Sequence, residues 1–187
     1  QPTESRHFIK SDAAKAKIRE SIRAINPDVI ALEEMGTTNA LLELRASLKN
    51  EGCDFPHWEH VQGFDTNIHI AILSKLPIVA RHPHTNDSFL LDGRRFRVSR
   101  GIVEVKIRAA QGYTFTLIAA HLKSRRPSPD ADESEMRFQE AKILRSIVDE
   151  HLAHNPDEKL VDLGDFNDVK SSASTQEIGR ASCRERV

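Results

Sequence analysis

Hydrophobic residues recur along this chain at two spacings, and the spacing separates helices from strands. Ile18, Ile22 and Ile25 fall on one stripe of a helix that begins after Ser11, a good N-cap residue, and stops before Pro27. Two further segments carry apolar residues at helical spacing. We therefore predict helices over residues 11–26, 38–50 and 133–154.

Short apolar or alternating runs between these helices predict strands. The run 29–32 is apolar throughout, as expected of a strand that is covered on both faces, and it ends on Glu33 and Glu34. We predict strands over residues 29–32, 57–62, 68–74, 96–108, 113–122 and 159–163. Because several strands follow one another in the middle of the chain, the order predicts an α/β fold with a mixed sheet rather than repeated βαβ units.

Composition narrows the possible functions. The 187 residues include 27 Lys and Arg and 28 Asp and Glu, which give a formal net charge of −1. This balance excludes a protein that holds nucleic acid by bulk positive charge, so a phosphate ligand needs a local basic patch or a metal. No apolar run approaches the roughly 18 residues of a membrane span. The two cysteines, Cys53 and Cys183, make neither a disulfide framework nor a zinc cluster. We expect a monomer.

The last residues differ from the rest of the chain. Residues 177–187 follow a Ser/Thr-rich stretch and have no useful hydrophobic period. They resemble translated adaptor sequence, and we interpret them as a non-native tail. A natural disordered tail is the alternative. Residues 1–176 predict one domain with no internal boundary before residue 170.

Three predicted strands end in polar side chains, and ligands of open α/β sheets bind just beyond strand ends. Glu33 and Glu34 are neighbours on the first strand and point to opposite faces, so at most one is expected to enter a shared site. A lone carboxylate there suits Mg²⁺, which takes few protein ligands and keeps its waters. An exposed acidic turn is the alternative.

The second such strand ends in a histidine. Leu117, Ala119 and His121 share one face by the period of two, and Lys123 shares it as well. A histidine at the end of an apolar face can act as a general acid or donate a hydrogen bond to a phosphate. A core histidine bonded to a backbone carbonyl explains the pattern equally well.

The third strand runs into a turn that begins at Gly164. Asp165 and Asn167 alternate after it and can point the same way. A carboxylate beside a neutral amide can orient a water and stabilise a phosphorane-like charge without two clashing anions. A structural turn rich in Asp and Asn is the alternative.

The order of these segments resembles the endonuclease/exonuclease/phosphatase family, which includes DNase I-like nucleases, sphingomyelinases and inositol phosphatases. The resemblance covers residues 22–168 and rests on the segments PDVIALEE, IHIAILSKLPI, SRGIVEV, AAHLKS and GDFND. It implies a two-sheet β sandwich flanked by helices, in four layers α/β/β/α. The family's initial strand that ends in Asn and its final Ser-Asp-His motif have no counterpart before residue 11 or after Asp168. We therefore expect an incomplete domain.

The resemblance also implies roles for particular residues. Glu34 resembles the family's metal-binding glutamate, and His121 resembles the histidine that contacts the scissile phosphate. Asp165 and Asn167 resemble the pair that orients the nucleophile and stabilises the transition state. Arg100 and Lys123 are expected to neutralise phosphate charge. By contrast, we expect Arg137 to pair with nearby acids and Asp168 to hold the turn together.

The activity that the resemblance implies is hydrolysis of a phosphodiester, with nucleic acid among the possible substrates. Mg²⁺ is the expected metal, with Mn²⁺ or Ca²⁺ as alternatives. A phosphomonoesterase, a phospholipid phosphodiesterase and a non-catalytic binding module on the same fold remain open. The implication concerns the complete domain more than the activity of this incomplete chain.

Overall fold

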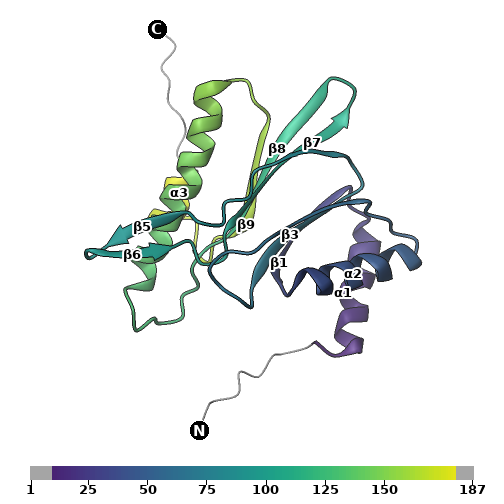
Figure 1. The fold of residues 1–187 in the computed structure, drawn as a ribbon, viewed down its shortest axis with the longest axis horizontal. Helices are drawn as coiled ribbons and strands as arrows, with labels where there is room; N and C mark the ends of the chain where they lie inside the picture. The colour runs from purple at the N-terminus through teal and green to yellow at the C-terminus, as the bar shows by residue number, and fades with distance from the viewer. Residues whose placement is uncertain (1–9, 180–187) are drawn as a thin grey trace.

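Two β-sheets lie face to face, with helices on their outer sides (Figure 1). The computed structural model describes residues 10–179. The first sheet has the order β1-β3-β2, in which the strands are Val29–Met35, His69–Ser74 and His57–Val61. The second has the order β4-β7-β8-β9, with strands Ile78–Arg81, Ile102–Ala110, Tyr113–His121 and Leu160–Asp165. All strand pairs are antiparallel except β8 and β9.

Three apolar clusters hold the layers together. Val61, Ile72, Val105 and Leu117 belong to the cluster between the two sheets. A second cluster joins the outer face of the first sheet to α1 (Asp12–Ile25) and α2 (Thr38–Asn50). A third joins the outer face of the second sheet to α3 (Glu133–His154). The expected two-sheet sandwich flanked by helices is confirmed.

The predicted helices match the structure because their ends carry explicit signals. The side chain of Ser11 accepts a hydrogen bond from the backbone N–H of Ala14, and the helix ends at Asn26, whose φ is 49°. Thr37 and Asp132 cap α2 and α3 in the same way. Burying a side chain such as Leu41 or Leu48 on the apolar stripe stabilises the fold by about 1.5–3 kcal/mol.

The prediction of one strand over residues 96–108 is wrong. β6 (Arg94–Arg97) pairs with β5 (Ser88–Leu91) in a separate hairpin, and β7 begins only at Ile102. The chain turns between them at Gly101, where φ is +72°. Gly63 lies against this turn so closely that a Cβ on it would be 2.3 Å from the backbone nitrogen of Gly101. Polar and apolar residues alternate both before and after the turn, and for this reason the sequence was interpreted as one strand.

The segment around the predicted start of the tail forms a helix. A short helix, α4 (Ala173–Ile178), includes the first two residues of the predicted tail. Ile178 packs against the cluster under α3. Residues 180–187, with Cys183, lie outside the described residues, and the non-native origin of the tail stays a prediction. Cys53 is buried with a free thiol.

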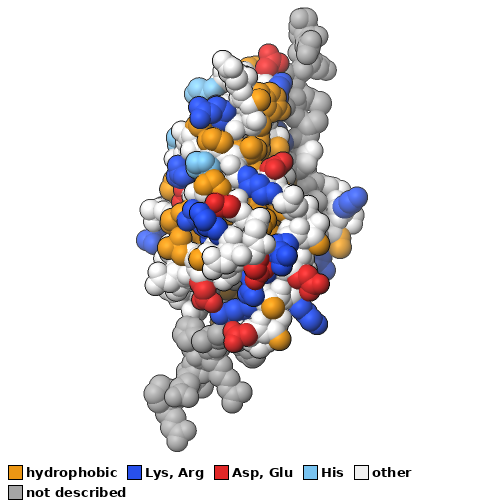
Figure 2. Space-filling model, turned by 90° about the vertical axis from the view of Figure 1, so that its right-hand side faces the viewer, with side chains coloured by type: hydrophobic (Ala, Val, Ile, Leu, Met, Phe, Trp, Pro, Cys, Tyr) orange, Lys and Arg blue, Asp and Glu red, His pale blue; other side chains and the backbone are white. Residues whose placement is uncertain are grey.

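The surface carries mixed charges. On the face in Figure 2, basic and acidic side chains are interspersed with apolar ones, and no large area has a single sign. Within residues 10–179, none of the helices has the length and apolar character needed to cross a membrane.

Candidate active site

The site lies at one edge of the sandwich, between the two sheets. Alternation along β8 puts His121 on the face of Leu117 and Ala119, which pack between the sheets. His121 and Asp165 are register partners on the adjacent parallel strands β8 and β9. Since parallel strands end at the same edge, their final side chains lie next to each other.

Three side chains from three strands converge at this edge. Glu33, His121 and Asp165 each offer one potential ligand atom, and these atoms lie within 4.8 Å of one another. The carboxylate of Glu33 also accepts a hydrogen bond of 2.6 Å from the backbone N–H of Asp165. His121 is buried, Glu33 is half-buried and Asp165 is exposed. The cluster is therefore open on one side.

Gly164 permits this convergence. Its φ is +150°, and a Cβ on it would lie 1.8 Å from the carbonyl oxygen of Ala120 and 3.0 Å from Oε1 of Glu33. Any side chain would force β9 away from β8 and from Glu33. The glycine thus brings the Asp165 backbone within hydrogen-bond reach of β1.

The structure places Glu33 in the cluster and leaves Glu34 outside it. Val29 and Ala31 pack between the sheets, so alternation directs Glu33 to the same side as His121. The register of β1 shifts between Leu32 and Met35, and Glu34 there has a φ of 53°. Both glutamates line a hollow of about 960 Å³ between α1, α2 and the end of β1.

The electrostatics of the cluster follow from burial and neighbouring charges. Burial lowers the pKa of His121, and the nearby Arg100 guanidinium lowers it further. The imidazole is therefore neutral at neutral pH, and among the described residues its Nδ1 atom has no hydrogen-bond partner. Burial raises the pKa of Glu33, although the hydrogen bond from Asp165 opposes the increase.

Arg100 and Asn167 meet at one carbonyl oxygen. The Nη1 atom of Arg100 donates to the Leu122 carbonyl at 2.7 Å, and the Nδ2 atom of Asn167 donates to the same oxygen at 3.0 Å. The backbone N–H of Asn167 donates to Oδ1 of Asp165 at 2.8 Å. Arg100 is buried, and its Nε atom has no partner among the described residues.

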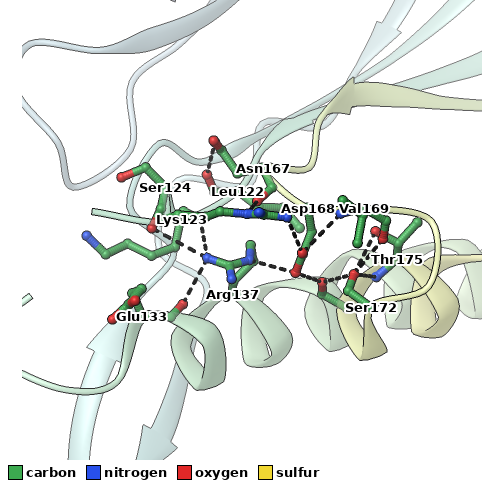
Figure 3. A network of polar contacts seen from close by, with 12 residues as sticks. Leu122, Lys123, Ser124, Glu133, Arg137, Asn167, Asp168, Val169, Ser172 and Thr175 are labelled. Carbon is green, nitrogen blue, oxygen red and sulfur yellow. Dashed lines mark hydrogen bonds and ion pairs between the residues drawn. The ribbon is translucent and has the colours of Figure 1, made fainter. Parts of the chain in front are cut away.

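Lys123 is the remaining predicted site residue, and its backbone groups make hydrogen bonds to α3. Its N–H donates to Glu140 and its carbonyl accepts from Arg137, both on α3. The expected pairing of Arg137 with an acid is confirmed, because its Nε atom lies 3.0 Å from Oδ2 of Asp168. Figure 3 shows Arg137 between Asp168 and the carbonyl groups of the 123–124 segment.

Sequence reasoning missed two acidic residues near the site. Asp65 acts electrostatically on His121 and accepts backbone hydrogen bonds within its own loop. Nothing in the polar segment around Asp65 pointed to this role. Glu140 is almost fully buried, and a signal for it existed: it lies in the helical row of Met136, Ile143 and Ile147, where a charged residue is unexpected.

Comparison with known proteins gives a family and a fold. A family model described as "Endonuclease/Exonuclease/phosphatase family" matches residues 6–185. No curated protein sequence matches the chain.

Several solved structures share the fold. A beta toxin from Staphylococcus aureus has a TM-score of 0.63 and 20% identity, with 89% of this chain and 63% of that chain covered. TDP2 from Caenorhabditis elegans has a TM-score of 0.63 and 18% identity, with 86% and 43% covered. Sphingomyelinase C from Streptomyces griseocarneus has a TM-score of 0.62 and 17% identity, with 92% and 65% covered. This chain thus spans less than two thirds of the length of each.

Proposed function

Because this chain belongs to the endonuclease/exonuclease/phosphatase family, we propose that it forms the metal-binding part of a phosphoesterase that hydrolyses phosphodiesters. The observation that carries the proposal is the convergence of Glu33, His121 and Asp165 at the open edge of the sandwich. These groups come from three strands far apart in the sequence. A turn rich in acidic residues does not explain their meeting.

The donor set fits a divalent cation. Two carboxylates suit Mg²⁺, whereas an imidazole ligand in addition to them favours Mn²⁺. We propose Glu33 and Asp165 as the metal-binding carboxylates, with Mg²⁺ as the ion. A beta toxin of the same fold has been solved with bound magnesium ions. A cation held here supplies positive charge that polarises the phosphate ester.

The chain's own residues supply the remaining chemistry. The Asp165 carboxylate, fixed by the N–H of Asn167, accepts a proton from a water that attacks phosphorus. The neutral His121 donates a hydrogen bond to a phosphate oxygen. Arg100, whose Nε atom has no hydrogen-bond partner within residues 10–179, balances the negative charge that grows in the transition state. Together these groups favour a phosphodiester, which carries a single negative charge.

The test is hydrolysis of bis(p-nitrophenyl) phosphate by the purified chain with Mg²⁺, Mn²⁺, Ca²⁺ or EDTA. We expect Mg²⁺-dependent release of nitrophenol, reduced by at least about 100-fold in Asp165→Ala. Asp157→Ala is the matched control, because Asp157 is an exposed aspartate in the loop before β9, at the opposite end of that strand.

Two results contradict the proposal. One is hydrolysis that is equal in Asp165→Ala and the wild type. The other is the absence of metal-dependent hydrolysis from a chain whose circular dichroism shows it to be folded. Phosphate binding without hydrolysis in that folded chain identifies a binding module instead.

A further inference from the structure

Two buried charged residues of α3 hold the two backbone polar groups of Lys123. The N–H of Lys123 donates to Oε2 of Glu140 at 2.6 Å, and the carbonyl of Lys123 accepts from Nη1 of Arg137 at 3.1 Å. Arg137 and Glu140 are three residues apart, so they lie on the same face of the helix. The two residues are 4% and 1% exposed.

Each of the two side chains also reaches a second segment of the site. Oε1 of Glu140 accepts the backbone N–H of Ser99 at 3.1 Å, directly before Arg100. The Nε atom of Arg137 donates to Asp168 at 3.0 Å, directly after Asn167 (Figure 3). α3 therefore connects the segments that carry Arg100 and Asn167, two of the predicted site residues.

The Leu122 carbonyl is the point where these connections meet. This carbonyl and the N–H of Lys123 belong to the same peptide group. Its oxygen accepts hydrogen bonds from the side chains of both Arg100 and Asn167. A peptide group is rigid and planar, so holding the Lys123 N–H fixes the direction of the Leu122 carbonyl. A small rotation of this peptide would displace both side chains together.

Packing alone does not account for charged residues at these positions. Burying a charge costs several kcal/mol, and apolar residues of similar volume usually stabilise a helix–sheet interface at least as well. The neighbours of Arg137 and Glu140 on this face, including Ala141 and Leu144, are apolar and buried. The two charges make directional contacts that apolar side chains cannot make.

We propose that Arg137 and Glu140 are positioning residues, which hold the backbone of Lys123 together with Ser99 and Asp168 and thereby set Arg100 and Asn167 for the reaction. This inference rests on the proposed phosphodiesterase function. Neither residue touches substrate; each acts through the backbone. The proposal predicts that conservative changes on α3 alter catalysis while the fold persists.

The informative variants are Arg137→Lys and Glu140→Gln. Lysine lacks the planar guanidinium group with which Arg137 contacts Asp168 and the Lys123 carbonyl at the same time. Glutamine has one acceptor oxygen, whereas Glu140 uses two, so one of the Ser99 and Lys123 amides loses its acceptor. We expect kcat to fall about 10- to 100-fold in each variant, as for groups that orient primary ligands. KM also rises in Glu140→Gln, because Arg100 is displaced.

A double-mutant cycle and a matched control separate positioning from stability. If Arg137 acts through Asn167, Arg137→Lys changes kcat less than about twofold in an Asn167→Ala background. Arg145→Lys is the control, because Arg145 is equally buried on α3 but bonds to Asp149 and the Ile178 carbonyl. It lowers the melting temperature without changing kcat or KM of the folded protein.

A spectroscopic readout keeps the test independent of activity. In ¹H–¹⁵N spectra of the full chain, the side-chain amide of Asn167 shifts in Arg137→Lys and Glu140→Gln but not in Arg145→Lys. A wild type without hydrolytic activity overturns the proposed function, and the spectra still decide the positioning role. Unchanged Asn167 signals in both variants overturn the positioning role. The positioning role is also overturned if the fall in kcat of the Arg137→Lys/Asn167→Ala double variant equals the product of the falls in the two single variants.

Discussion

Replacing Gly164 by alanine tests whether the close approach of β9 to β8 assembles the site. The new Cβ would lie 1.8 Å from the carbonyl oxygen of Ala120, and relief to 3.0 Å requires a shift of more than an ångström. A side chain at a φ of +150° costs about 1–3 kcal/mol. Overpacking against a fixed backbone costs about 1–3 kcal/mol more. We expect Gly164→Ala to lower the free energy of unfolding by about 4 kcal/mol.

The assay is urea unfolding followed by circular dichroism, with Gly112→Ala as the control. Gly112 also has a positive φ, of +74°, but a Cβ there would meet nothing within 4 Å. Its variant should therefore lose only about 1–2 kcal/mol, the cost of the backbone conformation. Equal losses in the two variants would refute the claim that the strands approach too closely for a side chain.

Two further predictions concern pH and are checked by thermal unfolding at several pH values. Burial raises the pKa of Asp162 to about 7, so its ionisation opposes folding, and stability falls as pH rises from about 4 through 7. Asp162→Asn should be more stable than the wild type at pH 8 and lose this dependence; a variant less stable at pH 8 contradicts it. Glu104 accepts hydrogen bonds from His84 at 2.8 Å and from His151 at 3.0 Å, and it raises the pKa of His84. Protonated His84 therefore stabilises the fold below the pKa that it has in the unfolded chain. This stabilisation is lost as the pH rises through the pKa of His84 in the folded protein. Glu104→Gln should thus lose more stability at pH 6 than at pH 9, and the opposite order contradicts it.

The sequence predicted the helices well because their limits are set by local chemistry. Ser11, Thr37 and Asp132 each cap the helix that follows, and the apolar stripes behind them are regular. The short strands β4 and β5 escaped prediction because four residues give too few positions to establish a period. Strand 96–108 was extended through a turn for a related reason, since polar and apolar residues alternate on both sides of Gly101. The phase changes there, from Val98 before the turn to Val103 and Val105 after it.

The candidate site could be predicted only in part. His121 and Asp165 were located because each ends an apolar strand. The choice between Glu33 and Glu34 needed the structure, because residues 29–32 are all apolar and do not reveal which face meets the second sheet. Only the packing of Ala31 between the sheets assigns Glu33 to the side of His121. Glu140 contributes through tertiary contacts to backbone amides, which have no pattern in the sequence.

The most direct test of the central claim is a Mn²⁺ titration of the chain, followed by electron paramagnetic resonance of the free ion. If Glu33 and Asp165 hold the metal, Glu33→Gln weakens binding by more than about 10-fold, the size expected when a ligand or its orientation is lost. Glu34→Gln, which removes the same charge one residue away, weakens it by less than about threefold. The account is contradicted if Glu34→Gln has the larger effect, or if neither variant changes Mn²⁺ affinity.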